Sequence, residues 1–235
     1  NGTFSEGKAV KSAILAPGKK ILLGHNTVLK YVLQDEIDLK YQREMFDSTT
    51  RDGLTGAFNR RYLMQKLIAD LSFARRHRLA FSIVLFDIDF FKRVNDTHGH
   101  LVGDQILKSI AGIVQNSIRT EDVLGRFGGE EFVVIAQGTD FRGAQILSER
   151  IRSAVANEPA LAVTDQGELV RITVSVGTIT LGAGAILDAH GLLGEADSNM
   201  YKAKNDGRNR IVATEIAPST ADSNLRRIPI PPKQP

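Results

Sequence analysis

Two glycines stand directly before two glutamates in the segment GGEEF at residues 128–132. Strand-like runs flank the glycines, and a Gly-Gly connection suits a type I′ or II′ hairpin turn, in which positive φ is required. Because glycine has no side chain, phosphate can also approach the backbone N–H groups there. Glu130 and Glu131 would point to opposite faces of a strand, so one of them can meet a metal ion. A tight hairpin with two solvated acids explains the same residues, and the segment alone leaves both interpretations open.

A second acidic segment, FDIDFFK at residues 86–92, follows a strongly apolar run. A carboxylate such as Asp87 at the end of a buried strand is costly unless it is paired or bound to a ligand. By the two-residue period of a strand, Asp87 and Asp89 are predicted to share a face. Mg²⁺ needs only one or two such carboxylates when phosphates supply the other oxygens, and Lys92 would then meet phosphate charge. The alternative is a strand-end Asp that caps a loop.

Two further polar segments carry groups suited to a nucleotide. Residues 95–104, NDTHGHLVGD, are dense in small polar groups and end in residues typical of a helix start. Asn and Asp side chains together can pair with a purine edge, and a carboxylate in that role favours guanine. Lys204 and Arg208, within residues 201–210, have the charge to bind a triphosphate. A loop with a helix cap, and lysines that offset a helix dipole, are the alternatives.

The elements that must position these residues are predicted from the hydrophobic pattern, which from residue 51 onward is that of a regular α/β domain. We predict helices over residues 60–76, 103–119, 141–157 and 192–204, and strands over residues 80–87, 123–127, 131–137, 170–178 and 210–213. The strand at residues 170–178 rests on the alternation of apolar and polar side chains. The segment 214–235 is polar, ends in several prolines and is predicted to be a flexible tail.

The first 50 residues are organised differently. Short β-type runs separated by a Pro-Gly turn predict two or three antiparallel strands, which are only marginally stable alone, at residues 8–10, 20–24 and 27–33. An amphipathic helix follows over about residues 35–50, in which Ile37, Tyr41 and Met45 recur four apart. This helix either lies on its own domain or is a signalling stalk that pairs with a second copy.

Composition excludes several classes of function. The chain has 235 residues and no cysteine, which excludes disulfides, zinc–cysteine sites and thiol catalysis. Its net charge is +3 and its one dense basic run is RRHR at residues 75–78, so we expect no nucleic-acid partner. No apolar run approaches 18 residues and no secretory signal is visible, so we expect no membrane span and a cytoplasmic location. The chain does not begin with methionine, which suggests a piece of a longer protein.

Taken in this order, the segments resemble the GGDEF family of diguanylate cyclases over about residues 51–212. RDGLTGAFNRR at residues 51–61 is similar to the family's D-x-L-T-G-L-x-N-R-R, and GGEEF is a variant of the GGDEF signature. The resemblance implies an α/β (α+β) fold with a central, mostly antiparallel sheet flanked by helices, like a nucleotidyl-cyclase palm. It also implies condensation of two GTP molecules into cyclic di-GMP, with release of pyrophosphate, by a two-fold homodimer that uses Mg²⁺, with Mn²⁺ as an alternative.

The resemblance also implies roles for single residues. Asp87, the Ile88 carbonyl and Glu130 would bind Mg²⁺, and Glu130 would be the base for the attacking hydroxyl. Glu131 would support the metal site. The remaining substrate-binding residues fall into two groups. The guanine would meet Asn95 and Asp104, with His100 in the same pocket, and the phosphates would meet Phe90, Phe91, Lys92, Gly129, Lys204 and Arg208.

A second site is expected just before the signature. RTED at residues 119–122 matches the family's inhibitory R-x-x-D motif, which binds product. An Arg119 guanidinium can stack on guanine and pair with phosphate, Asp122 can accept from the base edge, and Arg150 would complete the site. We therefore expect product inhibition. The alternative function is a catalytically weak GGDEF domain that acts as a cyclic di-GMP receptor through these three residues.

The N-terminal segment resembles another family. NGTFSEGKAV at residues 1–10 is similar to the NGTFVNGKRV segment of forkhead-associated domains, and residues up to 34 look like the last strands of that fold. Those domains bind phosphothreonine peptides, but their earlier phosphate ligands are absent here, so we expect phosphopeptide binding only in a full-length domain. The predicted organisation is a forkhead-associated fragment at 1–34, a linker helix at 35–50, a GGDEF domain at 51–213 and a tail at 214–235.

Overall fold

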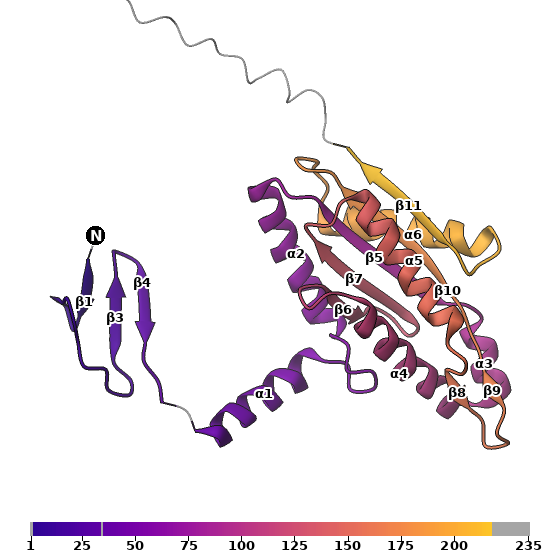
Figure 1. The fold of residues 1–235 in the computed structure, drawn as a ribbon, viewed down its shortest axis with the longest axis horizontal. Helices are drawn as coiled ribbons and strands as arrows, with labels where there is room; N and C mark the ends of the chain where they lie inside the picture. The colour runs from indigo at the N-terminus through magenta and orange to yellow at the C-terminus, as the bar shows by residue number, and fades with distance from the viewer. Residues whose placement is uncertain (1, 34, 218–235) are drawn as a thin grey trace, which may run out of the picture. The chain divides into compact units, whose positions relative to one another are not determined.

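The computed structural model describes residues 2–33 and 35–217, and the chain divides into two compact units at residues 49 and 50 (Figure 1). In the first unit, a four-stranded antiparallel sheet has the order β2-β1-β3-β4. Its strands are β1 (Thr3–Ser5), β2 (Lys8–Ala9), β3 (Lys20–Leu23) and β4 (Thr27–Lys30), and the helix α1 (Glu36–Thr50) follows. The sequence predicted two or three strands and missed β1, which is only three residues long. That this sheet derives from a forkhead-associated domain stays a prediction.

The second unit is built on a five-stranded sheet with the order β11-β10-β5-β7-β6. Its strands are β5 (Phe81–Ile88), β6 (Val123–Arg126), β7 (Glu131–Gln137), β10 (Val174–Leu181) and β11 (Ile211–Ile216). Only β10 and β11 run parallel, and the other neighbouring pairs are antiparallel. This confirms the predicted central, mostly antiparallel sheet. The short strands β8 (Ala162–Val163) and β9 (Leu169–Val170) form a separate hairpin.

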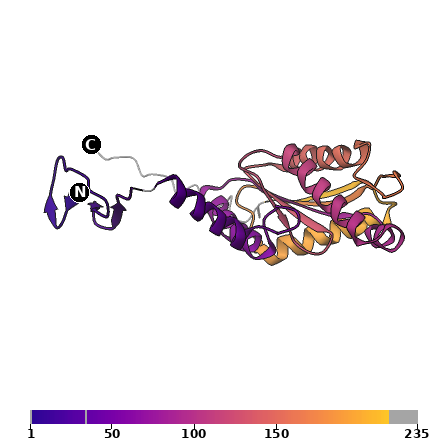
Figure 2. The ribbon, with the colours of Figure 1, turned by 90° about the horizontal axis from the view of Figure 1, so that it is seen from below.

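Helices cover both faces of this sheet. They are α2 (Arg60–His77), α3 (Phe91–His98), α4 (His100–Ser117), α5 (Phe141–Asn157) and α6 (Ala189–Asn205). Alternate residues of β5 enter two hydrophobic clusters: Ile83 and Leu85 pack with residues of α2 and α6, whereas Val84 and Phe86 pack with residues of α4 and α5. Figure 2 shows α5 on one side of the sheet and α6 on the other. Burial on both faces explains why β5 reads as a continuous apolar run in the sequence.

Three predictions of local structure were wrong. Residues 95–104 are not a loop, because they form the end of α3 and the start of α4, and Gly99 with φ of 82° makes the turn between them. The predicted strand at 170–178 is two strands, β9 and β10, with residues 171–173 between them. The last strand runs to Ile216, beyond the predicted boundary at residue 213. The rest of the predicted tail, residues 218–235, lies outside the described residues.

No helix within residues 2–33 and 35–217 is long and apolar enough to cross a membrane.

Gly177 allows α6 to approach the sheet closely. It lies on β10, on the face that carries Ile179, and a Cβ atom there would come within 2.1 Å of the Ala196 carbonyl oxygen. The same atom would lie 2.3 Å from the backbone nitrogen of Met200. Because both obstacles are helix backbone rather than flexible side chain, α6 must shift if this position carries a side chain. The contact therefore sets the distance of α6 from the sheet.

We expect Gly177→Ala to lower the free energy of unfolding by about 3 kcal/mol, because the methyl group overpacks the α6 contact. The matched control is Gly194→Ala on α6 itself, where a Cβ meets nothing within 4 Å. That substitution should be neutral or stabilise by up to about 1 kcal/mol. Denaturant unfolding measures both changes, and equal effects of the two substitutions would contradict the close-approach argument.

Candidate active site

A cluster of carboxylates lies where β5 ends and β7 begins. Asp87 is directly opposite Glu131 in the antiparallel pair, and both lie on the face of the sheet that α6 covers. Glu130 precedes Glu131 in the hairpin between β6 and β7. From the last turn of α6, the Lys204 Nζ atom lies 2.8 Å from the Asp87 Oδ1 atom. The structure thus brings together four of the residues that the sequence predicted for the metal and phosphate site.

Burial raises the pKa of two carboxyl groups of this cluster, Asp87 and Glu130. The Asp87 side chain is 6% exposed, and burial raises its pKa to about 6 in spite of the opposing effect of Lys204. The negative charges of Glu130 and Glu131 add to this increase. Burial and Glu131 also raise the pKa of Glu130, again against the effect of Lys204. Three crowded acids with one ammonium form a site that favours an additional cation.

The signature hairpin differs from its predicted turn type. Neither Gly128 nor Gly129 has positive φ, so the I′ or II′ turn predicted from the Gly-Gly pair is wrong. The backbone N–H groups of Phe127 and Gly128 both donate to the Glu131 carbonyl, at 2.8 and 3.3 Å, which closes a longer loop. A Cβ at position 128 would lie 2.4 Å from the Glu131 Oε2 atom, so the end of the Glu131 side chain would have to move if this residue were not glycine. At Gly129 a Cβ would meet nothing within 4 Å, which leaves the backbone open to a ligand.

Arg126 holds the signature hairpin by hydrogen bonds. Its Nε and Nη2 atoms donate to the Gly129 carbonyl at 3.1 and 2.6 Å. Its Nη1 atom donates to both carboxylate oxygens of Asp52 at 3.1 and 3.3 Å. Asp52 is fixed in turn by the backbone and hydroxyl groups of Thr55. Burial tends to raise the pKa of Asp52, but the hydrogen bonds from Thr55 and the charge of Arg126 outweigh it and lower that pKa. The sequence showed the D-x-L-T motif but not its partner.

The residues predicted for guanine lie around the α3–α4 turn. Asn95 is in α3, and His100 and Asp104 are in the first turns of α4. The Asn95 Oδ1 atom is buried and has no hydrogen-bond partner, and a Cβ at Gly103 would lie 2.0 Å from it. A buried amide oxygen without a partner is costly, so it is a candidate for a ligand contact. Asp104 is half-buried and His100 is exposed.

The residues predicted for phosphate come from two elements. Phe90 adopts φ of 58° and leads into α3, where Phe91 is buried and Lys92 is exposed. Arg208 follows α6, and its guanidinium carbon lies 4.5 Å from the centre of the Phe90 ring. This stack brings together two residues that are 118 positions apart in the sequence. It was not predictable, because the left-handed conformation of Phe90 has no sequence signal.

Asp89 lies on the same face of the sheet as Asp87, as the strand period predicted. β5 ends at Ile88, but the Asp89 N–H still donates to the Thr173 carbonyl and so continues the pairing with the strand segment before β10. The Asp89 carboxylate accepts hydrogen bonds from Thr173, Ser175 and Asn209, and Ser175 is the residue directly opposite Asp87. Its partners are therefore uncharged donors, whereas Asp87 forms an ion pair with Lys204.

The residues of the predicted inhibitory site lie beside β6. Asp122 is buried, one of its oxygens accepts from the Arg119 backbone N–H at 3.0 Å, and the other has no partner. Burial raises the pKa of Asp122, against the effects of Arg119 and Arg150. A groove of about 460 Å³ runs along this region and is lined by Asp122, Thr120, and residues of the segment 51–58 and of α4. The structure thus places Arg119 and Arg150 within electrostatic reach of Asp122.

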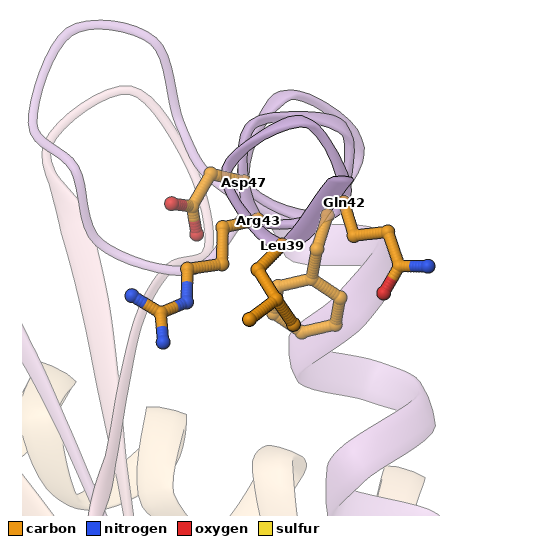
Figure 3. A pocket seen from close by; sticks show the side chains of 5 residues that line it. Leu39, Gln42, Arg43 and Asp47 are labelled. Atoms are coloured by element: carbon orange, nitrogen blue, oxygen red, sulfur yellow. The ribbon is translucent and has the colours of Figure 1, made fainter. Parts of the chain in front are cut away.

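A shallow pocket of about 390 Å³ lies on α1, and none of the residues predicted for the site lines it. Its lining consists of Leu39, Gln42, Arg43, Phe46 and Asp47, and Figure 3 shows Arg43 and Asp47 on one side of the helix and Gln42 on the other. Half or more of the surface of several apolar side chains of α1 is exposed, including Ile37 and Tyr41. These are the positions that the sequence predicted as an apolar stripe.

Comparison with known proteins identifies the second unit. The family described as "Diguanylate cyclase, GGDEF domain" matches residues 49–210 of the chain. The chain belongs to the GGDEF family. The response regulator PleD of Caulobacter vibrioides is 41% identical over 162 residues, which are 68% of this chain and 35% of PleD. The chain spans between about a third and a half of the length of the curated relatives it matches.

Solved GGDEF structures share the fold. The coiled coil and GGDEF domain of DgcB from Caulobacter crescentus, in complex with c-di-GMP, matches with a TM-score of 0.69 and 28% identity, over 75% of this chain and 91% of that one. The active GGEEF domain of a diguanylate cyclase from Vibrio cholerae matches with a TM-score of 0.59 and 35% identity, over 67% of this chain and 96% of that one. This second structure carries the same signature variant as the GGDEF domain described here.

The residues of this GGDEF domain fit a bound Mg²⁺ ion. Within the described part of the chain, no three His, Asp or Glu side chains are arranged to hold a metal by themselves. Mg²⁺ does not need such a set, because it binds through one or two carboxylates together with substrate phosphates and water. The buried Asp87 and the half-buried Glu130 offer carboxylate oxygens whose mutual repulsion a cation would relieve. These oxygen donors are of the kind that a hard divalent cation takes.

We expect Asp87→Asn to stabilise the metal-free domain at neutral pH. Above pH 6 the buried carboxylate is ionised at a cost that corresponds, for a pKa of about 6 against the ordinary value of 3.8, to roughly 3 kcal/mol. Below about pH 4 the carboxyl group is protonated in both the folded and unfolded states, so the cost disappears. The stability advantage of the Asn variant should therefore be present at pH 7 and lost as pH falls from 6 to 4. Thermal unfolding in EDTA at several pH values measures it, and an advantage that is independent of pH would contradict the argument.

We expect Asp52 and Arg126 to be energetically coupled. Arg126→Gln removes the charge that joins Asp52 to the Gly129 carbonyl, and Asp52→Asn removes the other partner. Because the two side chains are largely buried, a double-mutant cycle on the free energy of unfolding should give a coupling of about 1–2 kcal/mol. The comparison of both single variants with the double variant separates this coupling from the contacts of Asp52 with Thr55. Strictly additive losses in the free energy of unfolding would show that Asp52 and Arg126 are not coupled.

Proposed function

We propose that this chain is a diguanylate cyclase that condenses two GTP molecules into cyclic di-GMP and releases pyrophosphate. The observation that carries the proposal is the cluster of the buried Asp87 with the half-buried Glu130, Glu131 and Lys204, beside the open backbone of Gly129. Carboxylates for a metal, a cation for phosphate and bare backbone are the parts that phosphoryl transfer requires. An intact cluster of this kind favours an enzyme over the alternative of a receptor that only binds cyclic di-GMP.

The residues divide the work of binding. Asn95, Asp104 and His100 are assigned to the guanine, and the buried oxygen of Asn95 is a free acceptor for the base. Phe90, Phe91, Lys92, Gly129, Lys204 and Arg208 are assigned to the phosphates. Asp87, the Ile88 carbonyl and Glu130 would hold Mg²⁺, with Glu131 supporting them. When bound, Mg²⁺ neutralises charge on the phosphoryl group that is transferred.

The proposed chemical step requires two domains that face each other. The 3′-oxygen of one GTP forms a bond to the α-phosphorus of the other, and the bond from that phosphorus to the β-phosphate oxygen breaks. Glu130 accepts the proton of the 3′-hydroxyl, and its raised pKa makes it a stronger base than an exposed carboxylate. The same step, repeated with the roles exchanged, closes the ring. Each domain contributes one GTP, so we propose a two-fold homodimer as the active species.

We infer that the product inhibits the enzyme at Arg119, Asp122 and Arg150. The support is electrostatic: a buried carboxylate with one unpaired oxygen lies within reach of two guanidinium groups. That arrangement suits guanine and phosphate together. The forkhead-associated origin of residues 1–34 and the linker role of α1 remain part of the proposal, and phosphopeptide binding is proposed only for a full-length forkhead-associated domain.

The direct test is incubation with GTP and Mg²⁺ at high protein concentration, followed by chromatography for cyclic di-GMP and a pyrophosphate assay. We expect Glu130→Gln to reduce turnover by about 10²-fold or more, because the variant has neither the metal ligand nor the base. The matched control is Glu195→Gln on the exposed face of α6, which should leave turnover unchanged. Wild-type protein that binds cyclic di-GMP but forms none from GTP would support the receptor function instead.

A further inference from the structure

Asp89 is a buried carboxylate that the proposed mechanism does not use. It is 1% exposed, and each of its oxygens is an acceptor. The Thr173 hydroxyl donates to Oδ2 at 2.5 Å, the Ser175 hydroxyl donates to Oδ1 at 2.6 Å, and the Asn209 backbone N–H donates to Oδ2 at 3.1 Å. Its own N–H donates to the Thr173 carbonyl at 2.9 Å. All of these donors are uncharged, so hydrogen bonding alone compensates the burial of this charge.

The segments that Asp89 joins are both in strained conformations. Phe90, directly after it, has φ of 58°, and on the other side Arg208 and Asn209 have φ of 62° and 45°. A left-handed conformation costs a residue with a side chain about 1 kcal/mol or more, and it persists only when neighbouring contacts hold it. The Asn209 bond to Asp89 is such a contact. It joins the loop after α6 to the turn between β5 and α3. Asp89 directly precedes Phe90, and Asn209 directly follows Arg208, so the bond lies beside both left-handed residues.

We propose that Asp89 is a positioning residue for the phosphate-binding arginine. Its carboxylate holds the backbone of Asn209, and so it fixes Arg208 in the conformation that places its guanidinium over the Phe90 ring. It acts through Arg208 and does not itself touch the substrate or the metal. The inference rests on the proposed function, in which Arg208 binds the triphosphate. It assigns to the second aspartate of the segment 86–92 a task different from that of Asp87.

The hydrogen-bond pattern predicts which substitutions keep this function. An Asn at position 89 can place its oxygen at Oδ2, where Asn209 and Thr173 donate, and its amide toward Ser175, whose hydroxyl can turn to accept. An Ala at position 89 leaves the Asn209 N–H unpaired and the left-handed backbone without an anchor. Asp89→Ala should therefore release Arg208, and Asp89→Asn should largely retain it.

The experiment is a double-mutant cycle on kcat/KM for GTP, with Asp89→Ala, Asp89→Asn, Arg208→Ala and the double variant Asp89→Ala/Arg208→Ala. We expect Asp89→Ala to lower kcat/KM by about 10–100-fold, mainly through KM, and Asp89→Asn by less than about 5-fold. The double variant should be within about 3-fold of Arg208→Ala alone, because both substitutions remove the same interaction. Unchanged kcat/KM in Asp89→Ala would overturn the inference. So would losses that multiply in the double variant.

Two further variants separate positioning from folding. Ser148→Ala removes another buried hydroxyl, which joins α5 to Thr178 of β10 by a hydrogen bond. This variant should lower the melting temperature without changing kcat/KM. If Asp89→Ala does not fold, Thr173→Val takes its place, because it removes one hydrogen-bond donor to the Asp89 carboxylate. Thr173→Val should lower kcat/KM by about 3-fold in the wild-type background and should have no effect in the Arg208→Ala background. An effect of Thr173→Val that persists in that background would overturn the inference.

The outcomes distinguish this inference from the proposed function. Wild-type protein that binds GTP by calorimetry but forms no cyclic di-GMP overturns the proposed function only, and the same cycle is then measured on Kd. Wild-type protein that neither binds nor converts GTP overturns both. Normal turnover combined with additive effects of Asp89→Ala and Arg208→Ala overturns the positioning role alone.

Discussion

The ion pair between Asp87 and Lys204 joins the central strand β5 to the last turn of α6, with 2.8 Å between the two charged atoms. Neither residue could lie there without the packing behind it, because α6 approaches β10 so closely that Gly177 has no room for a side chain. The helix delivers a cation to an acidic cluster that burial would otherwise make unstable. Even with this cation, burial keeps the pKa of Asp87 raised, and the charges of Glu130 and Glu131 add to the increase. A further positive charge beside Asp87 would lower that pKa, which is the electrostatic reason that the site suits a cationic ligand.

Around that cluster, irregular backbone is held by specific polar contacts rather than by secondary structure. Arg126 joins the Gly129 carbonyl of the hairpin to the Asp52 carboxylate, and Asp89 accepts a hydrogen bond from the backbone of the loop at Asn209. In both cases one charged side chain bridges two segments that are distant in sequence. Such bridging hydrogen bonds suit a site that must present bare backbone and strained residues to a ligand, because packing alone does not fix exposed loops.

Much of the scaffold could be predicted from the sequence, because its strands and helices have strong periodic signals. Helix α5 and strand β7 were predicted with their observed bounds, and Asp87, Glu130 and Lys204 were predicted as neighbours. That neighbourhood came from the family resemblance, since no local pattern connects residues 87 and 204. The errors lie where backbone conformation departs from the regular period. The signature hairpin closes without positive φ at Gly128 or Gly129, and the segment 95–104 turns between two helices at Gly99.

The position of β6 bears on how binding near Asp122 can influence the site. Asp122 directly precedes this strand, and Arg126, which binds the Gly129 carbonyl, ends it. Only about 13 Å of extended chain therefore separates the predicted product site from Arg126. β6 is mostly buried and is paired with β7 in register along its whole length. A strand fixed in this way offers no second arrangement for a ligand to select, and coupling between sites requires such a two-state element. The inhibition proposed at Arg119 and Asp122 would therefore act through a change in how two domains face each other rather than through distortion of one active-site half. Since each domain holds only one GTP in the proposed reaction, control of that encounter is sufficient to control the chemistry.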